Sequence, residues 1–212
     1  MPAELEAKFR ADGIEPLRSL ASESHLADAV LGAARTVDEL DRYLDTADGR
    51  LSARLWACRL REREGRTRVS LKGAQEGVGE DWMHHRPEVE GPATASFDPA
   101  DWPESEARTF LERLTGGAPL IERFHLRQRR TERTVSEHGR LVGTLTLDLV
   151  TIVHGERSIG ELFIVEFEMA DGDAAHARAD LERLAPKLAG RPGLRPDSRT
   201  KLDHALERLE GR

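Results

Sequence analysis

The sequence has little of several residue types, and each shortage excludes a class of protein. Its 212 residues include a single cysteine, Cys58, which excludes an intrachain disulfide and a cysteine-based metal cluster. No apolar run approaches the length of about 20 residues that a transmembrane helix needs, so no membrane association is expected. The N-terminus carries Glu4 and Glu6 and lacks the basic and apolar regions of a signal peptide. We therefore expect a cytoplasmic protein.

Net positive charge is also missing. The formal net charge is -7 and the pI is about 5.7, whereas non-specific nucleic-acid binding requires a basic surface. The sequence has no glycine-rich phosphate loop and no nucleophilic triad motif, and its eight histidines show no metal-ligand spacing. The 32 lysine and arginine residues still allow a local basic pocket. Nucleic acid is therefore not an expected partner, whereas a smaller anion is compatible with the composition.

The sequence is rich in segments that alternate charged and apolar residues. In the stretch 4–9 (ELEAKF), two glutamates and a lysine alternate with leucine, alanine and phenylalanine. This period of two predicts a β-strand with one charged and one apolar face. Further strands are predicted at residues 40–46, 51–64, 66–72, 84–90, 120–135, 140–153 and 161–169. Asp48-Gly49 is a strong signal for a hairpin turn between the strands on either side of it.

Helices are predicted between and after these strands. In residues 24–35, Leu26, Val30 and Leu31 share one stripe of a helix. A helical insert is predicted at about 98–117, and C-terminal helices at about 173–210. No linker is long enough to separate two domains. We predict a single α+β domain over residues 1–212, with a mostly antiparallel sheet of about eight strands.

Charges of one sign gather strand by strand, which leaves two interpretations open. Arg59 and Arg61 share one strand face, whereas Glu166 and Glu168 share another. The charged faces could be the solvated side of an open sheet. Alternatively, about eight strands are enough to close into a barrel with the charged faces inside. Buried charges are costly unless they are compensated or bind a ligand. An acidic cluster that binds Mg²⁺ or Mn²⁺ beside a basic cluster that binds phosphate would meet that condition.

The ordered series of charged residues resembles the CYTH domain family, also called the triphosphate tunnel metalloenzymes. Glu4-x-Glu6-x-Lys8 resembles the ExExK signature of that family, and the segment RYLDTADGRLSARLWACRLRER resembles its Tyr-x-Asp-Thr stretch followed by an Arg-x-Arg strand. The further matches are Lys72 in SLKG, Glu88-x-Glu90, the arginine strand, Asp148 in LTLDLV, Glu166-x-Glu168 and the C-terminal SRTKLDHAL. The resemblance implies an eight-stranded antiparallel closed β-barrel that forms a tunnel with a charged interior and is flanked by helices.

The resemblance also implies a role for each of these residues. The implied ligands of Mg²⁺ or Mn²⁺ are Glu4, Glu6, Asp148, Glu166 and Glu168. The implied substrate-binding residues are Lys8, Arg59, Arg61, Lys72, Arg127, Arg129 and Lys201. Lys8 and Glu168 are the expected catalytic residues, and Glu88 and Glu90 are expected to support them. The register near Arg129 stays open, because a bulge would turn Arg130 inward instead.

The implied activity is divalent-metal-dependent hydrolysis of a triphosphate, either inorganic or carried by a small organic group. Carboxylates suit hard divalent cations, and arginine offers two parallel donors to phosphate oxygens. Two alternatives remain: an adenylate cyclase that forms cyclic AMP from ATP, and a non-catalytic module that binds polyphosphate or nucleotide. The sequence favours neither a monomer nor a homodimer.

Overall fold

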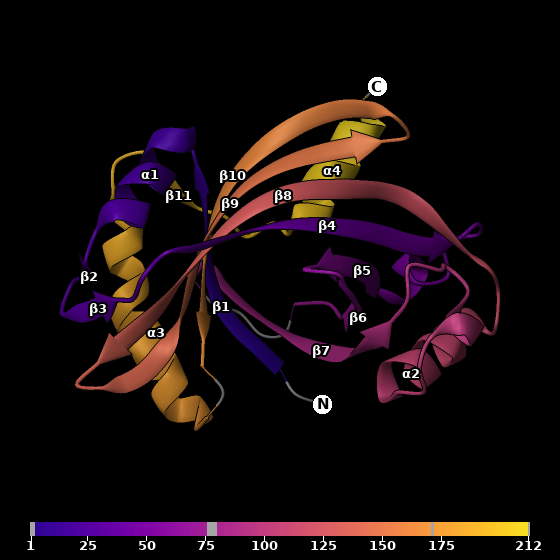
Figure 1. Cartoon of the computed structure of the whole chain (residues 1–212), viewed down its shortest axis with the longest axis horizontal. Coiled ribbons are helices and arrows are strands. Elements are labelled where there is room, and N and C mark those ends of the chain that lie inside the picture. Colours follow the sequence, from indigo (N-terminus) through magenta and orange to yellow (C-terminus); the bar gives the residue numbers. More distant parts are fainter. Residues whose placement is uncertain (1–2, 76–79, 171, 212) are drawn as a thin grey trace.

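The computed structural model describes residues 3–75, 80–170 and 172–211 (Figure 1). Its helices are α1 (Ile14–Ser22), α2 (Glu106–Thr115), α3 (Ala174–Ala189) and α4 (Lys201–Glu210), with short 3-10 turns η1 (Ser52–Arg54) and η2 (Pro99–Asp101). Its strands are β1 (Ala3–Ala11), β2 (His25–Leu26), β3 (Ala29–Leu31), β4 (Arg35–Thr46), β5 (Ala57–Arg63), β6 (Arg66–Lys72), β7 (Met83–Ala93), β8 (Leu120–Glu137), β9 (Arg140–His154), β10 (Arg157–Met169) and β11 (Leu194–Pro196).

In the part of the chain that the structure describes, eight strands close into an antiparallel barrel. The order around the barrel is β8-β4-β5-β6-β7-β1-β10-β9, and the pairing of β9 with β8 closes it. The hairpin of β2 and β3 extends the sheet beside β8, and β11 pairs with the end of β1. The predicted α+β fold, with an eight-stranded closed antiparallel barrel flanked by helices, is confirmed.

Apolar side chains at alternate strand positions point out of the barrel and pack beneath helices. On one side, Phe9 of β1 and Phe167 of β10 are fully buried in a cluster with Leu184 of α3. On another side, Val69 of β6 packs in a cluster with Leu111 of α2. Each fully buried side chain of this size contributes about 1.5–3 kcal/mol to folding. Because the alternation has period two, the charged side chains of the same strands face the interior.

A third apolar cluster lies inside the barrel, at the end where α4 enters it. Leu126 of β8 and Ile164 of β10 are on the inward faces of their strands, and they cluster with Ala205 of α4. Tyr43 of β4 stacks on Phe124 of β8 in the same cluster, with ring centroids 4.7 Å apart. The helix thus packs on an apolar half of the interior, and the charged half remains open beside it.

The helix predicted at residues 24–35 is wrong. This segment forms the β2–β3 hairpin, in which Ala27 has the left-handed φ of 53° that the tight turn requires. Leu26 and Leu31 are buried, but as strand residues in the apolar cluster that includes Leu184 of α3. The helix that precedes this hairpin, α1, was not predicted. The strand predicted at residues 51–64 is shorter, because residues 52–54 form η1 and β5 begins at Ala57.

The helices near the C-terminus begin with side-chain caps. Asp173 caps α3 by accepting from the backbone N–H of His176. Thr200 and Asp203 form a capping box at the start of α4, so Lys201 is the first helical residue. The helix α2 lies within residues 98–117 and is capped by Ser105. No helix among the described residues is long and apolar enough to cross a lipid bilayer.

Candidate functional site

The barrel encloses a cavity of about 860 Å³ whose walls carry charges of both signs. Its basic lining residues are Lys8, Arg59, Arg61, Arg63, Lys72, Arg86, Arg130 and Lys201. Its acidic lining residues are Glu4, Glu6, Glu88, Glu90, Glu132, Glu166, Glu168 and Asp203. A cavity of this size is typical of sites for small-molecule ligands. The density of charge favours a polyanionic ligand accompanied by cations.

Two neighbouring strands, β1 and β10, place carboxylates side by side. Glu6 of β1 is directly opposite Glu168 of β10, and Lys8 is directly opposite Glu166. Burial and the charges of Glu4 and Glu166 raise the pKa of Glu6 to about 8. Glu168 is exposed to solvent in the cavity, but partial burial and the Glu4 charge raise its pKa to about 7. Burial and neighbouring carboxylates therefore disfavour the charged form of both glutamates.

The third carboxylate of this wall, Glu4, is held by basic side chains. Lys72 Nζ lies 2.6 and 2.7 Å from its two oxygens, and Arg86 Nε donates to Oε2 at 3.3 Å. Although burial opposes ionisation, Lys72 and Arg86 lower the pKa of Glu4 to about 2. Glu88 lies 3.3 Å from the same lysine. Lys72 therefore links β6 to acids on both β1 and β7.

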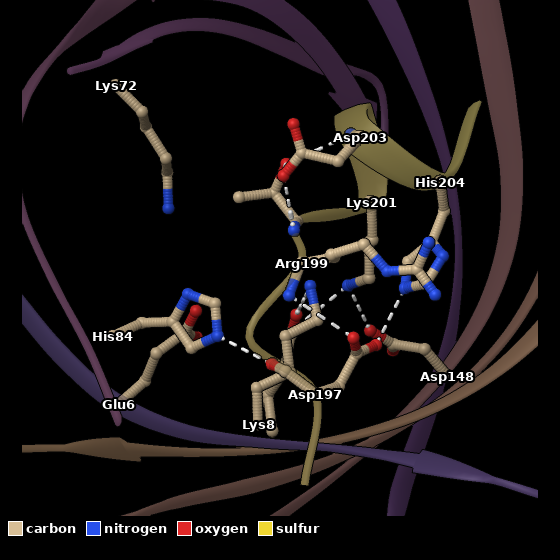
Figure 2. A network of polar contacts seen from close by, with 12 residues as sticks. Glu6, Lys8, Lys72, His84, Asp148, Asp197, Arg199, Lys201, Asp203 and His204 are labelled. Carbon is tan, nitrogen blue, oxygen red and sulfur yellow. Dashed lines mark hydrogen bonds and ion pairs between the residues drawn. The ribbon is translucent and has the colours of Figure 1, made fainter. Parts of the chain in front are cut away.

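A second cluster joins β8, β9, β10 and α4, and Figure 2 shows two of its members, Asp148 and Lys201. Asp148 is completely buried and accepts two hydrogen bonds from Arg130, at 2.8 and 2.6 Å. Lys201 Nζ reaches from α4 to Asp148 Oδ2 at 2.6 Å and to Glu166 Oε2 at 2.9 Å. Burial opposes ionisation of Asp148, but Arg130 and Lys201 lower its pKa. The cluster is thus fully ionic, with two cations holding two carboxylates.

Lys8 connects the two clusters. Its side chain is almost completely buried, and its Nζ lies 3.6 Å from Glu166 Oε1. Burial lowers the pKa of Lys8, and the Glu166 charge opposes that change. Burial also works against the charge of Glu166, but Lys201, Lys8 and Arg130 hold its pKa well below the ordinary range. A single carboxylate therefore faces three cations.

On the opposite wall, Asp41 of β4 organises the arginines of β5. Arg61 donates to both of its oxygens, at 2.6 and 2.7 Å, and Arg59 lies 3.6 Å away. Although burial opposes ionisation, Arg61 and Arg59 lower the pKa of Asp41. Gln128 also donates to Asp41, and buried Glu39 lies 3.2 Å from Arg61. Asp41 and Glu39 were not predicted, although the alternation in VDELDRY (37–43) carries the signal for both.

Several buried oxygens in this barrel have no hydrogen-bond partner. Among the described side chains they are Glu6 Oε1, Glu39 Oε2, Glu88 Oε1, Gln128 Oε1 and Thr146 Oγ1. All five belong to inward-facing positions of the barrel strands. Of these residues, Glu6, Glu88 and Thr146 line the cavity. Buried polar atoms are normally paired, so these three oxygens indicate a ligand, an ion or ordered water there.

These oxygens allow a test of whether the cavity suits a divalent metal. Within residues 3–75, 80–170 and 172–211, no three His, Cys, Asp or Glu side chains are already grouped in a way that could hold one. Glu6 and Glu168 nevertheless fit, because they are adjacent, carry raised pKa values and include an unpartnered oxygen. Carboxylate oxygens are the donors that Mg²⁺ and Mn²⁺ prefer.

Comparison with known families identifies the chain. The family model for the CYTH domain matches residues 2–199. The chain belongs to the CYTH domain family. The comparison with curated protein sequences found no match to the chain.

Solved structures similar to this CYTH domain share its fold at low sequence identity. A candidate adenylyl cyclase from Hippeastrum with a dominant triphosphatase activity has a TM-score of 0.68 and 20% identity, covering 96% of this chain and 95% of its own. A candidate adenylate cyclase from Bacillus halodurans has a TM-score of 0.61 and 20% identity, covering 96% and 98%. A protein from Pyrococcus horikoshii has a TM-score of 0.59 and 17% identity, covering 95% and 98%.

The cavity of this CYTH domain contains most of the residues predicted for it. Those that line it are Glu4, Glu6, Lys8, Arg59, Arg61, Lys72, Glu88, Glu90, Glu166, Glu168 and Lys201. Asp148 lies directly behind this lining, in contact with Lys201. Arg86 and Arg63 also line the cavity and were not among the predicted site residues.

The placement predicted for Arg127 and Arg129 is wrong. Both side chains are exposed on the outer face of β8, and the inward position belongs to Arg130, which is only 8% exposed. The prediction assumed that the apolar residues of every strand face outward. On β8 the inward face carries Leu126 as well as Arg130, because α4 packs against it inside the barrel. Between Leu126 and Arg130, the even-numbered residues of β8 therefore face the interior, not the odd-numbered residues that were expected to do so.

Proposed function

We propose that this CYTH domain hydrolyses a triphosphate with the help of a divalent cation, inside the barrel cavity. The observation that carries the proposal is the arrangement of the cavity, in which adjacent carboxylates with raised pKa values face walls of arginine and lysine. Inorganic triphosphate, or a small organic triphosphate, matches the chemistry of both walls. The triphosphatase activity of the Hippeastrum protein, which has the same fold, supports this reaction class.

The basic residues are proposed to bind the phosphate chain. Arg59, Arg61 and Lys72 supply donors from β5 and β6, and Lys8, Arg130 and Lys201 supply them from the opposite walls. In the structure these cations hold carboxylates of the cavity. A triphosphate would replace some of those contacts with its own oxygens. Cations that are already ionised and held in place need little reorganisation to stabilise the charge of the transition state.

Glu6 and Glu168 are the residues proposed to hold Mg²⁺ or Mn²⁺, with Glu4 and Glu166 beside them. A bound divalent cation would supply charge neutralisation at phosphate oxygens and would favour ionisation of water. We assign a different role to Asp148, which was predicted as a metal ligand. Arg130 and Lys201 occupy both of its oxygens, so it holds these cations in position for the substrate.

Glu168 and Lys8 are the proposed catalytic residues. Glu168 is exposed to the cavity, where a carboxylate can act as a general base toward a bound water. It would accept a proton from the attacking water. Lys8 is buried beneath the same wall and would neutralise charge that develops on the phosphoryl group under attack.

Formation of cyclic AMP from ATP is a second candidate, which is favoured by one observation. The Hippeastrum and Bacillus halodurans structures that share this fold are both named as adenylate cyclases. That reaction needs the same phosphate-binding walls and, in addition, a group that activates the ribose 3′-hydroxyl.

A substrate panel separates the two candidates. The full chain would be incubated with triphosphate, thiamine triphosphate, ATP or long polyphosphate, in the presence of Mg²⁺ or Mn²⁺, while phosphate and cyclic AMP are both measured. Metal-dependent phosphate release from a triphosphate, without cyclic AMP, is the expected result. Cyclic AMP as the main product of ATP would favour the cyclase. An absence of turnover on the whole panel would refute both.

A further inference from the structure

Asp197, between β11 and α4, joins three elements at the wall of the cavity (Figure 2). Its backbone N–H donates to the carbonyl of Lys8 on β1 at 3.1 Å. Its own carbonyl accepts from His84 Nε2 on β7 at 2.8 Å. Its carboxylate Oδ2 accepts from His204 Nε2 on α4 at 2.7 Å. Its other oxygen, Oδ1, accepts from the backbone N–H of Arg199 at 3.2 Å, so every polar group of this residue has a partner.

Three residues that these hydrogen bonds join, Asp197 and the two histidines, are buried. His204 is 1% exposed, His84 2% and Asp197 6%. A carbonyl oxygen can only accept, so His84 carries its proton on Nε2, and His204 likewise donates from Nε2 to a carboxylate. A network that is buried and satisfied in this way fixes the geometry of the groups it joins, because losing one partner leaves the others unpaired.

The geometry of α4 connects this network to Lys201. His204 follows Lys201 by three residues, so the two side chains lie on neighbouring positions of the same helix face. Lys201 extends to Asp148 and Glu166, whereas His204 turns back to Asp197 in the segment before the helix. The roll and the depth of the first turn of α4 are thus fixed at two points. One point is Lys201, the proposed phosphate ligand, and the other is His204, which does not line the cavity.

We infer that the Asp197–His204 contact is a positioning device that sets how far Lys201 reaches into the cavity. The inference rests on the proposed function, because it takes Lys201 as a ligand of the triphosphate. His204 and Asp197 are positioning residues, and the contact between their side chains acts through α4. If the contact is lost, the first turn of α4 can roll, and Lys201 binds phosphate less well although its own charge is intact.

A double-mutant cycle measures whether His204 acts through Lys201. Affinity for inorganic triphosphate would be measured by calorimetry on the metal-free full chain, for wild type, His204→Leu, Lys201→Met and the double variant. We expect His204→Leu to weaken binding about tenfold in the wild-type background and less than twofold in the Lys201→Met background. An equal effect in both backgrounds, or no effect in either, would overturn the inference.

Two further variants separate positioning from folding. His204→Gln keeps an N–H donor toward Asp197 and is expected to bind triphosphate within about threefold of wild type. If His204→Leu does not fold, Asp197→Asn takes its place in the cycle, since the amide weakens the same contact without removing the acceptor. The matched control is His176→Leu, because His176 makes a similar contact with Asp173 at 2.9 Å on the exposed end of α3. This control should leave the affinity unchanged, and an equal loss in it would contradict the inference.

Amide hydrogen exchange distinguishes a failure of the inference from a failure of the proposed function. If the wild-type chain binds triphosphate neither with nor without Mg²⁺, the proposed function is wrong. The positioning of α4 would still be tested, because His204→Leu should speed exchange at residues 202–205 about tenfold relative to His176→Leu. Unchanged exchange at these residues would refute the role of the contact.

Discussion

Replacing Glu6 with glutamine should change how the stability of the metal-free protein depends on pH. Glu6 is buried between acids, and one of its oxygens has no hydrogen-bond partner. Glutamine has nearly the same shape but no charge. The substitution therefore removes the ionisation of Glu6 and leaves the packing of β1 almost unaltered.

The expected size of the effect follows from the pKa of Glu6, which is about 8 in the folded protein against an ordinary value of 4.5. Between these values the folded state retains a proton that the unfolded state has released. The free energy of unfolding therefore falls as the pH rises, with a limiting slope of about 1.4 kcal/mol per pH unit for one proton. Between pH 7 and 8, where Glu6 begins to ionise in the folded state, the loss is about 1 kcal/mol.

Glu168, whose pKa is about 7, also titrates near this pH window, but it is present in wild type and in both variants. Burial lowers the pKa of His84 below 6.5, so His84 contributes stability that rises with pH, but only at pH values below about 7. Urea denaturation of the metal-free protein at pH 7 and pH 8 would compare wild type, Glu6→Gln and the exposed control Glu161→Gln. We expect wild type and Glu161→Gln to lose about 1 kcal/mol more than Glu6→Gln between the two pH values. The same pH dependence in all three proteins would refute the reasoning.

The remaining predictions concern the ion pairs of the cavity and the metal. Arg130→Met should weaken triphosphate binding at least tenfold in calorimetry, whereas Arg129→Met, on the outer face of the same strand, should not; equal losses would mean that the inward position is misassigned. Asp41→Asn should lower the free energy of unfolding by about 3 kcal/mol in urea denaturation, because it removes the buried carboxylate that accepts two hydrogen bonds from the half-buried Arg61, and a loss below about 1 kcal/mol would contradict this. Adding Mg²⁺ at pH 8 should raise the melting temperature of wild type more than that of Glu6→Gln; an equal rise in both would argue against metal binding at Glu6.

The division of charged and apolar faces made the barrel predictable from the sequence. Each strand repeats the period of two that ELEAKF shows at the N-terminus, and the register then places Glu6 opposite Glu168. Some strands carry only apolar residues on one face, so their charged residues could be assigned to the interior directly. Glu166 is an example. The short apolar spacing of residues 24–35 could not be assigned in this way, because Leu26 and Leu31 fit a helix stripe as well as a hairpin.

Long-range packing accounts for what the sequence pattern could not supply. Nothing local to β8 indicates that α4, about 70 residues later, enters the barrel and makes the inward face of that strand apolar at Leu126. Which of Arg129 and Arg130 faces the interior depends on that contact. The pairing of Asp41 with Arg61 likewise depends on the register between β4 and β5, which alternation within a single strand does not determine.

Phosphate release by wild type, Glu168→Gln and Glu161→Gln tests the central claim most directly. Both glutamates lie on β10, but Glu168 opens into the cavity and Glu161 is exposed outside its lining. With triphosphate and Mg²⁺ or Mn²⁺, we expect wild type and Glu161→Gln to release phosphate at equal rates and Glu168→Gln to be at least about 100-fold slower. Equal rates in all three proteins, or no metal-dependent release by any of them, would contradict the account.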